Sequence, residues 1–274
     1  MKTAKRLLSF LLAVLLLSGC CFAFARSAGD YSGYRQYVSL GDSIADGIGE
    51  NNVENKYMHR TPGAYPDRIA NELGAELTQL GCGGMRTVEL RACLESDYVM
   101  PDEYANNFNR EVVKSIRGRF APAISNADII TLNIGSNDVA TYALLRAKSA
   151  SSALGVAIDS KVAELEAEGE YTGALVTLLN AVKTVDRYGS IVSEAISGLT
   201  EGYLRFCENW DAIIGDIYAL NPDVTLLVAG FYNPLDHLKI SDDSLLELGK
   251  AADGIMELMS LKISSGSPYS SRYI

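Results

Sequence analysis

A serine flanked by glycine and aspartate follows the first apolar segment of the chain. Residues 37–43 (YVSLGDS) read as a short buried strand that runs into a Gly/Asp turn. Such a turn exposes the hydroxyl and the backbone N–H of Ser43, which suits a nucleophile, although a serine hydroxyl needs a base to become reactive. The alternative is that Asp42 and Ser43 cap the helix that follows. The tripeptide alone leaves both interpretations open.

A glycine-rich turn, residues 81–87 (GCGGMRT), follows the next strand candidate. Glycine lets the backbone approach a ligand closely and aim an N–H at it. A dinucleotide-binding turn does not fit, because the Gly-x-Gly-x-x-Gly pattern needs glycine at position 86, where Arg86 stands. The other interpretation is a plain tight turn.

A Gly-Ser-Asn-Asp turn, residues 135–138, follows the clearest buried strand of the sequence. The side-chain amide of Asn137 could donate a hydrogen bond to a developing negative charge. One such donor contributes on the order of 3 kcal/mol to an acyl-transfer transition state. The alternative is an Asx turn that starts a helix.

Together these three turns resemble the SGNH, or GDSL-type, hydrolase family. The resemblance extends from Tyr37 to about Pro234, and residues 231–234 (FYNP) also look like members of this family. It implies that Ser43 is the nucleophile. It also implies an oxyanion hole made of the Ser43 N–H, the Gly84 N–H and the Asn137 amide, with no metal or organic cofactor. The family's substrates are esters: lipids, acylated sugars or thioesters. For this chain we expect a small-molecule, glycan or lipid ester as the substrate.

The resemblance departs at the general base. The family has an Asp-x-x-His motif near its C-terminus, in which the histidine is the base. The chain has two histidines, His59 and His237, and Lys56 and Pro234 stand where the aspartate of that motif would be. Two explanations remain open. The chain ends before the family's last strand and catalytic histidine, or His237, beside Asp236, acts as the base.

The missing base bears on the activity that we expect. Removing a member of a catalytic triad leaves only about 10³–10⁴-fold catalysis from the oxyanion site and substrate binding. We therefore expect a serine esterase or lipase that forms an acyl intermediate on Ser43 with weak activity. The alternative is a non-catalytic module that binds an acylated glycan or lipid in the same pocket.

The elements that must position these residues follow from the apolar pattern. Strands are predicted at 37–43, 76–80, 128–134 and 224–229, and helices at 65–73, 87–94 and 244–261. Continuous apolar strands that alternate with helices indicate a parallel sheet covered on both faces. We expect a three-layer α/β/α sandwich, flavodoxin-like, with a helical insertion at about 140–220 and with the last strand missing. Ligands of such folds bind beyond the carboxyl ends of the strands, where the three turns would converge.

Composition excludes several classes of protein. With 48% hydrophobic and 21% charged residues, the chain is that of an ordinary globular protein. A net charge of −10, without a concentrated basic patch, argues against binding to nucleic acid. Of the cysteines that follow residue 25, Cys82 and Cys93 could form a disulfide, although three free thiols with Cys207 are equally compatible with the sequence. No Cys-x-x-Cys pair or His cluster indicates a zinc site.

The N-terminus has the anatomy of a secretory signal. Basic residues precede an apolar run at 7–17, which is shorter than the roughly 20 residues of a membrane span. We expect secretion with cleavage after Ala25. The alternative is a lipoprotein anchored through Cys20, because residues 17–20 (LSGC) resemble a lipobox. The hydrolase-like domain would then cover 26–262, followed by a polar tail at 263–274.

Overall fold

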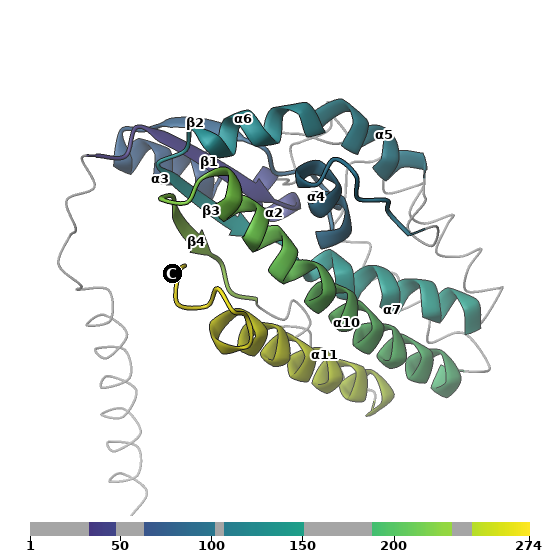
Figure 1. The fold of residues 1–274 in the computed structure, drawn as a ribbon. Helices are drawn as coiled ribbons and strands as arrows, with labels where there is room; N and C mark the ends of the chain where they lie inside the picture. Colours follow the sequence, from purple (N-terminus) through teal and green to yellow (C-terminus); the bar gives the residue numbers. More distant parts are fainter. Residues whose placement is uncertain (1–32, 48–62, 102–106, 151–187, 232–242) are drawn as a thin grey trace, which may run out of the picture.

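The computed structural model describes residues 33–47, 63–101, 107–150, 188–231 and 243–274 (Figure 1). In chain order, the strands are β1 (Gln36–Gly41), β2 (Glu76–Gln79), β3 (Ile129–Asn133) and β4 (Thr225–Val228). They form one sheet in the order β2-β1-β3-β4, and every neighbouring pair is parallel. Tyr37 stands opposite Leu77 on one side and Ile129 on the other. The predicted parallel sheet is confirmed.

The helices of the described residues are α2 (Ser43–Asp46), α3 (Tyr65–Leu73), α4 (Thr87–Leu94), α5 (Asn107–Ile116), α6 (Phe120–Ser125), α7 (Ser136–Ala150), α10 (Tyr188–Leu220) and α11 (Asp243–Leu261). Short turns of helix also occur at η2 (Arg117–Arg119) and η3 (Lys262–Gly266). Within the described ranges, no helix has both the length and the apolar composition needed to cross a membrane.

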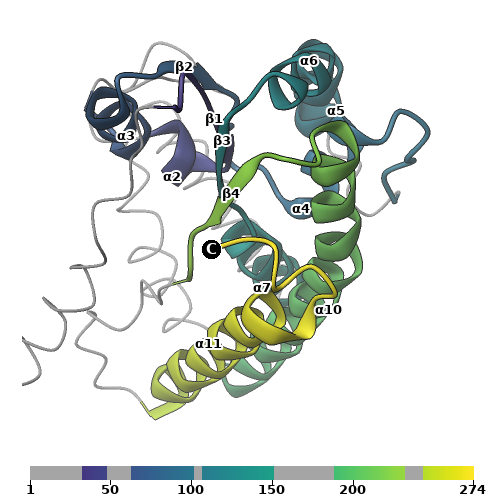
Figure 2. The same ribbon diagram turned by 60° about the vertical axis from the view of Figure 1, so that its left-hand side comes forward.

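Helices cover both faces of the sheet. Alternate side chains of each strand point to opposite faces, so apolar residues on both faces need a layer of helices to bury them. Val38 and Leu40 of β1 belong to the larger core, which packs against α4, α6 and α10. Tyr37 and Ile129 belong to a smaller core that includes Ala70 of α3. Figure 2 shows α2 and α3 on one face of the sheet and α4, α6 and α10 on the other. The expected three-layer arrangement is therefore present.

The helical insertion consists of α7 and α10 in the part of the chain that the structure describes; residues 151–187 lie outside it. The two helices pack along each other as they extend from the sheet (Figure 1). The C-terminal end of α10 is held by Asn221, whose Nδ2 donates to the carbonyl oxygens of Ile124 and Ala127 at 2.9 and 2.7 Å. These bonds fix the C-terminal end of α10 to α6 and to the segment that precedes β3.

Residues 263–274 pack against the fold, where their composition predicted a polar tail. The ring of Tyr273 meets Trp210 of α10 edge-on, with the ring centroids 6.2 Å apart. The Arg272 guanidinium lies 3.7 Å from the centre of the Tyr218 ring, and the Tyr218 hydroxyl donates to the Arg272 carbonyl at 2.8 Å. These aromatic contacts are long-range, so the local polar composition does not indicate them.

The last residue also pairs with the outer edge of β4. Ile274 N donates to Leu226 O at 3.0 Å, and Val228 N donates to Ile274 O at 2.8 Å. This is the slanted pattern of a parallel ladder, with Ile274 beside Leu227. Ile274 thus stands at the position of a fifth strand, where the sequence indicated nothing that could extend the sheet.

Candidate active site

Ser43 lies where β1 passes into α2. Asp42 caps this short helix, because its Oδ1 accepts the Ile44 N–H at 3.0 Å. Ser43 is half-buried and is the first helical residue, so its N–H has no acceptor within the helix. Burial raises the pKa of Asp42 to about 6, although the hydrogen bond from Ile44 lowers it. Asp42 therefore caps the helix, as one of the two interpretations of the sequence expected. Ser43 lies at the carboxyl edge of the sheet, as the first residue of that helix.

The ends of β1 and β3 pack closely together at Gly41, which stands opposite Asn133 in the sheet. Its φ is +146°, and a Cβ at this position would lie 2.0 Å from the Asn133 carbonyl oxygen. The Asp42 N–H donates to the same oxygen at 3.1 Å. Only glycine, which has no Cβ, allows the backbone at position 41 to lie this close to the end of β3.

Gly84 lies in a tight turn after β2. The Met85 N–H donates to Cys82 O at 3.0 Å, and Gly84 is exposed with a φ of +75°. The Cys82 N–H donates to Gly41 O at 3.0 Å, which ties this turn to the end of β1. The tight-turn interpretation is therefore correct for the backbone, and the turn lies beside the Ser43 loop.

Asn137 is the second residue of α7 and is half-buried. Its Nδ2 donates to Met85 O at 3.1 Å. The side chain thus reaches a different loop, although the sequence also allowed an Asx turn at its own helix. Asn137 and Gly84 are brought together by this bond, because Gly84 immediately precedes the residue that accepts it.

The strand order explains why these three residues share one region. β1 lies between β2 and β3, and all three strands run in the same direction. The loop of Ser43 is therefore flanked by the loop of Gly84 on one side and that of Asn137 on the other. Such an arrangement can surround a reacting carbonyl group with one hydroxyl and several N–H donors.

Both candidate bases lie outside the described residues: His59 falls in 48–62, and His237 falls in 232–242. Among the residues that the structure describes, no group of three His, Cys, Asp or Glu side chains could hold a metal ion. Within the described part of the chain, no disulfide joins Cys82, Cys93 and Cys207. Burial raises the pKa of both the Cys82 and the Cys93 thiol to about 12, which makes them poor nucleophiles.

A buried polar cluster beneath the site was not singled out from the sequence. Arg86 and Glu89 are 3% and 2% exposed and form an ion pair, and Glu89 also accepts the Arg86 N–H at 2.9 Å. Next to them, the Asp138 carboxylate accepts the Thr87 N–H at 2.9 Å. The sequence indicated these two residues only by their place, since Thr87 is the last residue of the turn at 81–87 and Asp138 is the last residue of the turn at 135–138.

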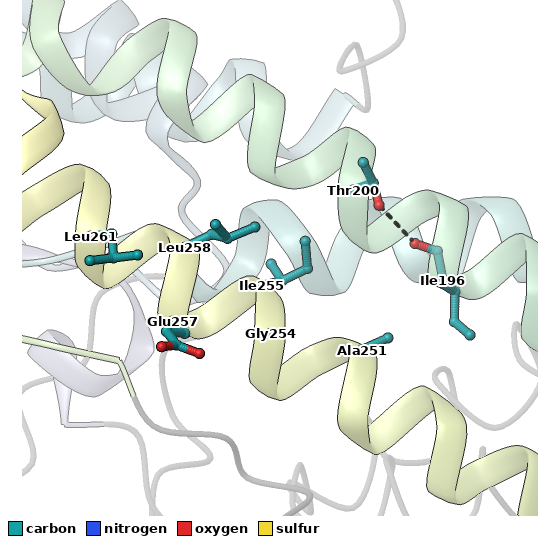
Figure 3. Close-up of a pocket in the computed structure, with 8 residues that line it drawn as sticks. All are labelled: Ile196, Thr200, Ala251, Gly254, Ile255, Glu257, Leu258 and Leu261. Carbon is teal, nitrogen blue, oxygen red and sulfur yellow. Dashed lines mark hydrogen bonds between the residues drawn. The ribbon is translucent and has the colours of Figure 1, made fainter.

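An apolar groove lies apart from these residues, between α10 and α11 (Figure 3). It has a volume of about 530 Å³ and is lined by Ile196, Thr200, Ala251, Gly254, Ile255, Glu257, Leu258 and Leu261. Leu258 and Leu261 are 43% and 50% exposed. None of Ser43, Gly84 and Asn137 lines this groove.

The chain is similar to known lipases and to a phospholipase. Over 108 residues it is 30% identical to Lipase 2 of Streptomyces coelicolor, a match that covers 39% of this chain and 30% of that lipase. Two solved structures, each 16% identical, cover 85% of this chain. They are an extracellular lipase from Streptomyces rimosus (TM-score 0.46, 76% of that chain) and phospholipase A1 from Streptomyces albidoflavus NA297 (TM-score 0.48, 77% of that chain).

The family match covers most of the chain and includes all three turns of the candidate site. Residues 39–257 match the GDSL-like Lipase/Acylhydrolase family. This range begins within β1 and ends within α11. The chain therefore belongs to the GDSL-like lipase/acylhydrolase family.

Proposed function

We propose that this protein is a serine-dependent hydrolase of carboxylic esters. Ser43 Oγ attacks the carbonyl carbon of the ester, and the alcohol leaves with a proton. Water then hydrolyses the acyl-serine ester and releases the acid. The oxyanion of each step accepts hydrogen bonds from the N–H groups of Ser43 and Gly84 and from the Asn137 amide. Membership of the lipase/acylhydrolase family supports ester hydrolysis as the reaction class.

The observation that carries this proposal is the hydrogen bond from Asn137 Nδ2 to Met85 O. A carbonyl oxygen can only accept, so the amide nitrogen and not the amide oxygen faces the turn of Gly84. This nitrogen has two N–H groups. One is used on Met85, and the second is available to an oxyanion beside the Gly84 N–H.

A general base must take the proton of Ser43. His237 is the candidate that the sequence offers, and Asp236 adjoins it. Replacing His237 by alanine tests this assignment. A large fall in kcat would support His237 as the base, whereas an unchanged low rate would support catalysis by the oxyanion site alone.

The nucleophile is tested by hydrolysis of a short p-nitrophenyl ester with the purified full chain. Ser43→Ala should lower the rate below that of the wild type, to at most the residual of about 10³–10⁴-fold over buffer that the oxyanion site and substrate binding supply. The matched control is Ser197→Ala, which removes an exposed hydroxyl bonded to its own helix at Ser193 O. A Ser43→Ala protein that hydrolyses the ester as fast as the wild type would refute the proposal. Ester binding without Ser43-dependent turnover would instead identify a binding module.

The oxyanion donor is tested in the same assay with Asn137→Ala. The loss of one such donor lowers kcat by about 10²–10³-fold. Asn126→Ala is the control, because Asn126 is exposed and its side chain donates to Pro122 O of the adjacent helix α6. Equal kcat values for the two variants would remove Asn137 from the proposed site.

We further propose that the enzyme acts outside the cell on small-molecule, glycan or lipid esters. The basic and apolar segments of residues 1–25 support export, with cleavage after Ala25 or lipidation at Cys20 as the two routes. Both routes place the hydrolase domain beyond the cytoplasmic membrane.

A further inference from the structure

Asp138 is an acidic residue near the candidate site that is only 1% exposed. Its Oδ2 accepts the Thr87 N–H at 2.9 Å, and the Thr87 hydroxyl donates to its Oδ1. Thr87 is itself fully buried and is the first residue of α4. Both oxygens of one carboxylate are thus bound to one residue of another helix, across 51 positions of sequence.

The pair joins the two loops that carry the proposed oxyanion donors. Asn137 immediately precedes Asp138, and Gly84 lies three positions before Thr87. Asn137 Nδ2 donates to Met85 O, and in the opposite direction the Thr87 N–H donates to the Asp138 carboxylate. Bonds in both directions fix the separation and the relative rotation of the two loops.

A third helix determines the direction of the Thr87 hydroxyl. Asn209 of α10, which is 4% exposed, donates from Nδ2 to Thr87 Oγ1 at 3.3 Å. Asn209 Nδ2 also donates to Arg205 O at 2.9 Å, so the orientation of this amide is set by its own helix. A hydroxyl has one proton to donate, and because Thr87 accepts from Asn209 it directs that proton to Asp138.

Burial of this carboxylate is unfavourable by itself. Desolvation raises the pKa of Asp138 to about 7 even though both Thr87 donors lower it. An apolar pair of similar volume would avoid this penalty, so the fold does not need a carboxyl group here for stability. The carboxyl group instead fixes the relative orientation of the two helices that carry Asp138 and Thr87, because hydrogen bonds are directional and apolar contacts are not.

We propose that Asp138 and Thr87 are positioning residues that hold the Gly84 and Asn137 loops where both donors serve one oxyanion. This inference rests on the proposed ester hydrolase function. Neither residue contacts the substrate in this proposal. A misplacement of about 1 Å in a catalytic group can lower a rate by about 10²-fold, so a small shift between these loops is enough to affect turnover.

The test compares Thr87→Val with Thr87→Ser in p-nitrophenyl ester hydrolysis. Valine keeps the β-branched shape and the N–H bond to Asp138 but removes the hydroxyl, whereas serine keeps the hydroxyl. We expect Thr87→Val to lower kcat by about 10–100-fold with little change in KM, because oxyanion stabilisation operates only in the transition state. Thr87→Ser should retain kcat within about threefold of the wild-type value.

Thr200→Val is the matched control, since Thr200 is exposed on α10 and its hydroxyl bonds to Ile196 O of the same helix at 3.4 Å. Circular dichroism at the assay temperature checks that each variant is folded. A merely structural role for Thr87 would lower the folded fraction or leave kcat unchanged. It would not lower the kcat of a folded enzyme at constant KM.

A double-mutant cycle with Asn137→Ala provides the second measurement. If Thr87 acts by positioning Asn137, Thr87→Val should have less than about a threefold further effect in the Asn137→Ala background. Effects that multiply, or a Thr87→Val enzyme with wild-type kcat, would overturn the inference while Ser43-dependent hydrolysis persists. Hydrolysis that does not depend on Ser43 would instead refute the proposed function, and the inference with it.

Discussion

Replacing Asp138 by asparagine should remove a pH dependence from the stability of this fold. Burial raises the pKa of the Asp138 carboxyl from 3.8 to about 7. The hydrogen bonds from Thr87 lower this pKa, and the charges of Glu89 and Arg86 raise and lower it by smaller amounts. Between about pH 4 and pH 7, the folded chain therefore keeps a proton on Asp138 that the unfolded chain releases.

The magnitude follows from proton linkage. Where the folded state binds more protons than the unfolded state, the free energy of unfolding falls as the pH rises. A pKa that rises from 3.8 to about 7 corresponds to about 4 kcal/mol, at about 1.4 kcal/mol for each pH unit. This contribution is complete below pH 4 and is lost as the pH rises through about 7.

The assay is urea unfolding, followed by circular dichroism between pH 5 and pH 8. From pH 5 to pH 8, the wild type should lose about 3 kcal/mol more stability than Asp138→Asn. Burial also raises the pKa of Asp42 to about 6, but this group titrates in both proteins and cancels in the difference. Asp253→Asn, at an exposed position of α11, is the control and should follow the wild type. Parallel stability curves for the wild type and Asp138→Asn would refute the reasoning.

Two further predictions concern the framework of the site. Gly41→Ala should destabilise the fold by several kcal/mol, on the order of the largest single substitutions, because the new methyl group would lie 2.0 Å from Asn133 O; a urea midpoint equal to that of the wild type would contradict this. Deleting residues 272–274 should cost about 2–4 kcal/mol in the same assay, since it removes the ring and backbone contacts with α10 and β4. Ile274→Ala should change stability by less than about 0.5 kcal/mol, because that side chain is 76% exposed and pairs through its backbone.

The elements that the sequence predicted well are those with local signals at their ends. α3 begins and ends where predicted, because Pro66 stands in its first turn and Gly74 takes the left-handed conformation after its last residue. α4 also matches its predicted bounds of 87–94. β3 was found as an apolar run, and it is buried at four of its five positions. Each of these signals acts within a few residues, so no tertiary information was needed.

The C-terminal residues show where local signals fail. Residues 264–271 are rich in serine, with a glycine and a proline, a composition typical of a surface turn. Tyr273 nevertheless packs on Trp210, and Ile274 pairs with β4. These partners lie more than forty positions away along the chain, so only the folded chain brings them into contact.

The candidate site divides in the same way. Residue types and glycine-rich turns pointed to Ser43, Gly84 and Asn137, because each follows a predicted strand and parallel strands end at one edge. The sequence did not indicate that Asn137 would donate to Met85 O, or that Asp138 would accept from Thr87. Those bonds depend on the order of the strands and on the close approach of loops some fifty residues apart. Candidate site residues can thus be proposed from local sequence, whereas the hydrogen bonds that join their elements arise from long-range contacts that no local pattern encodes.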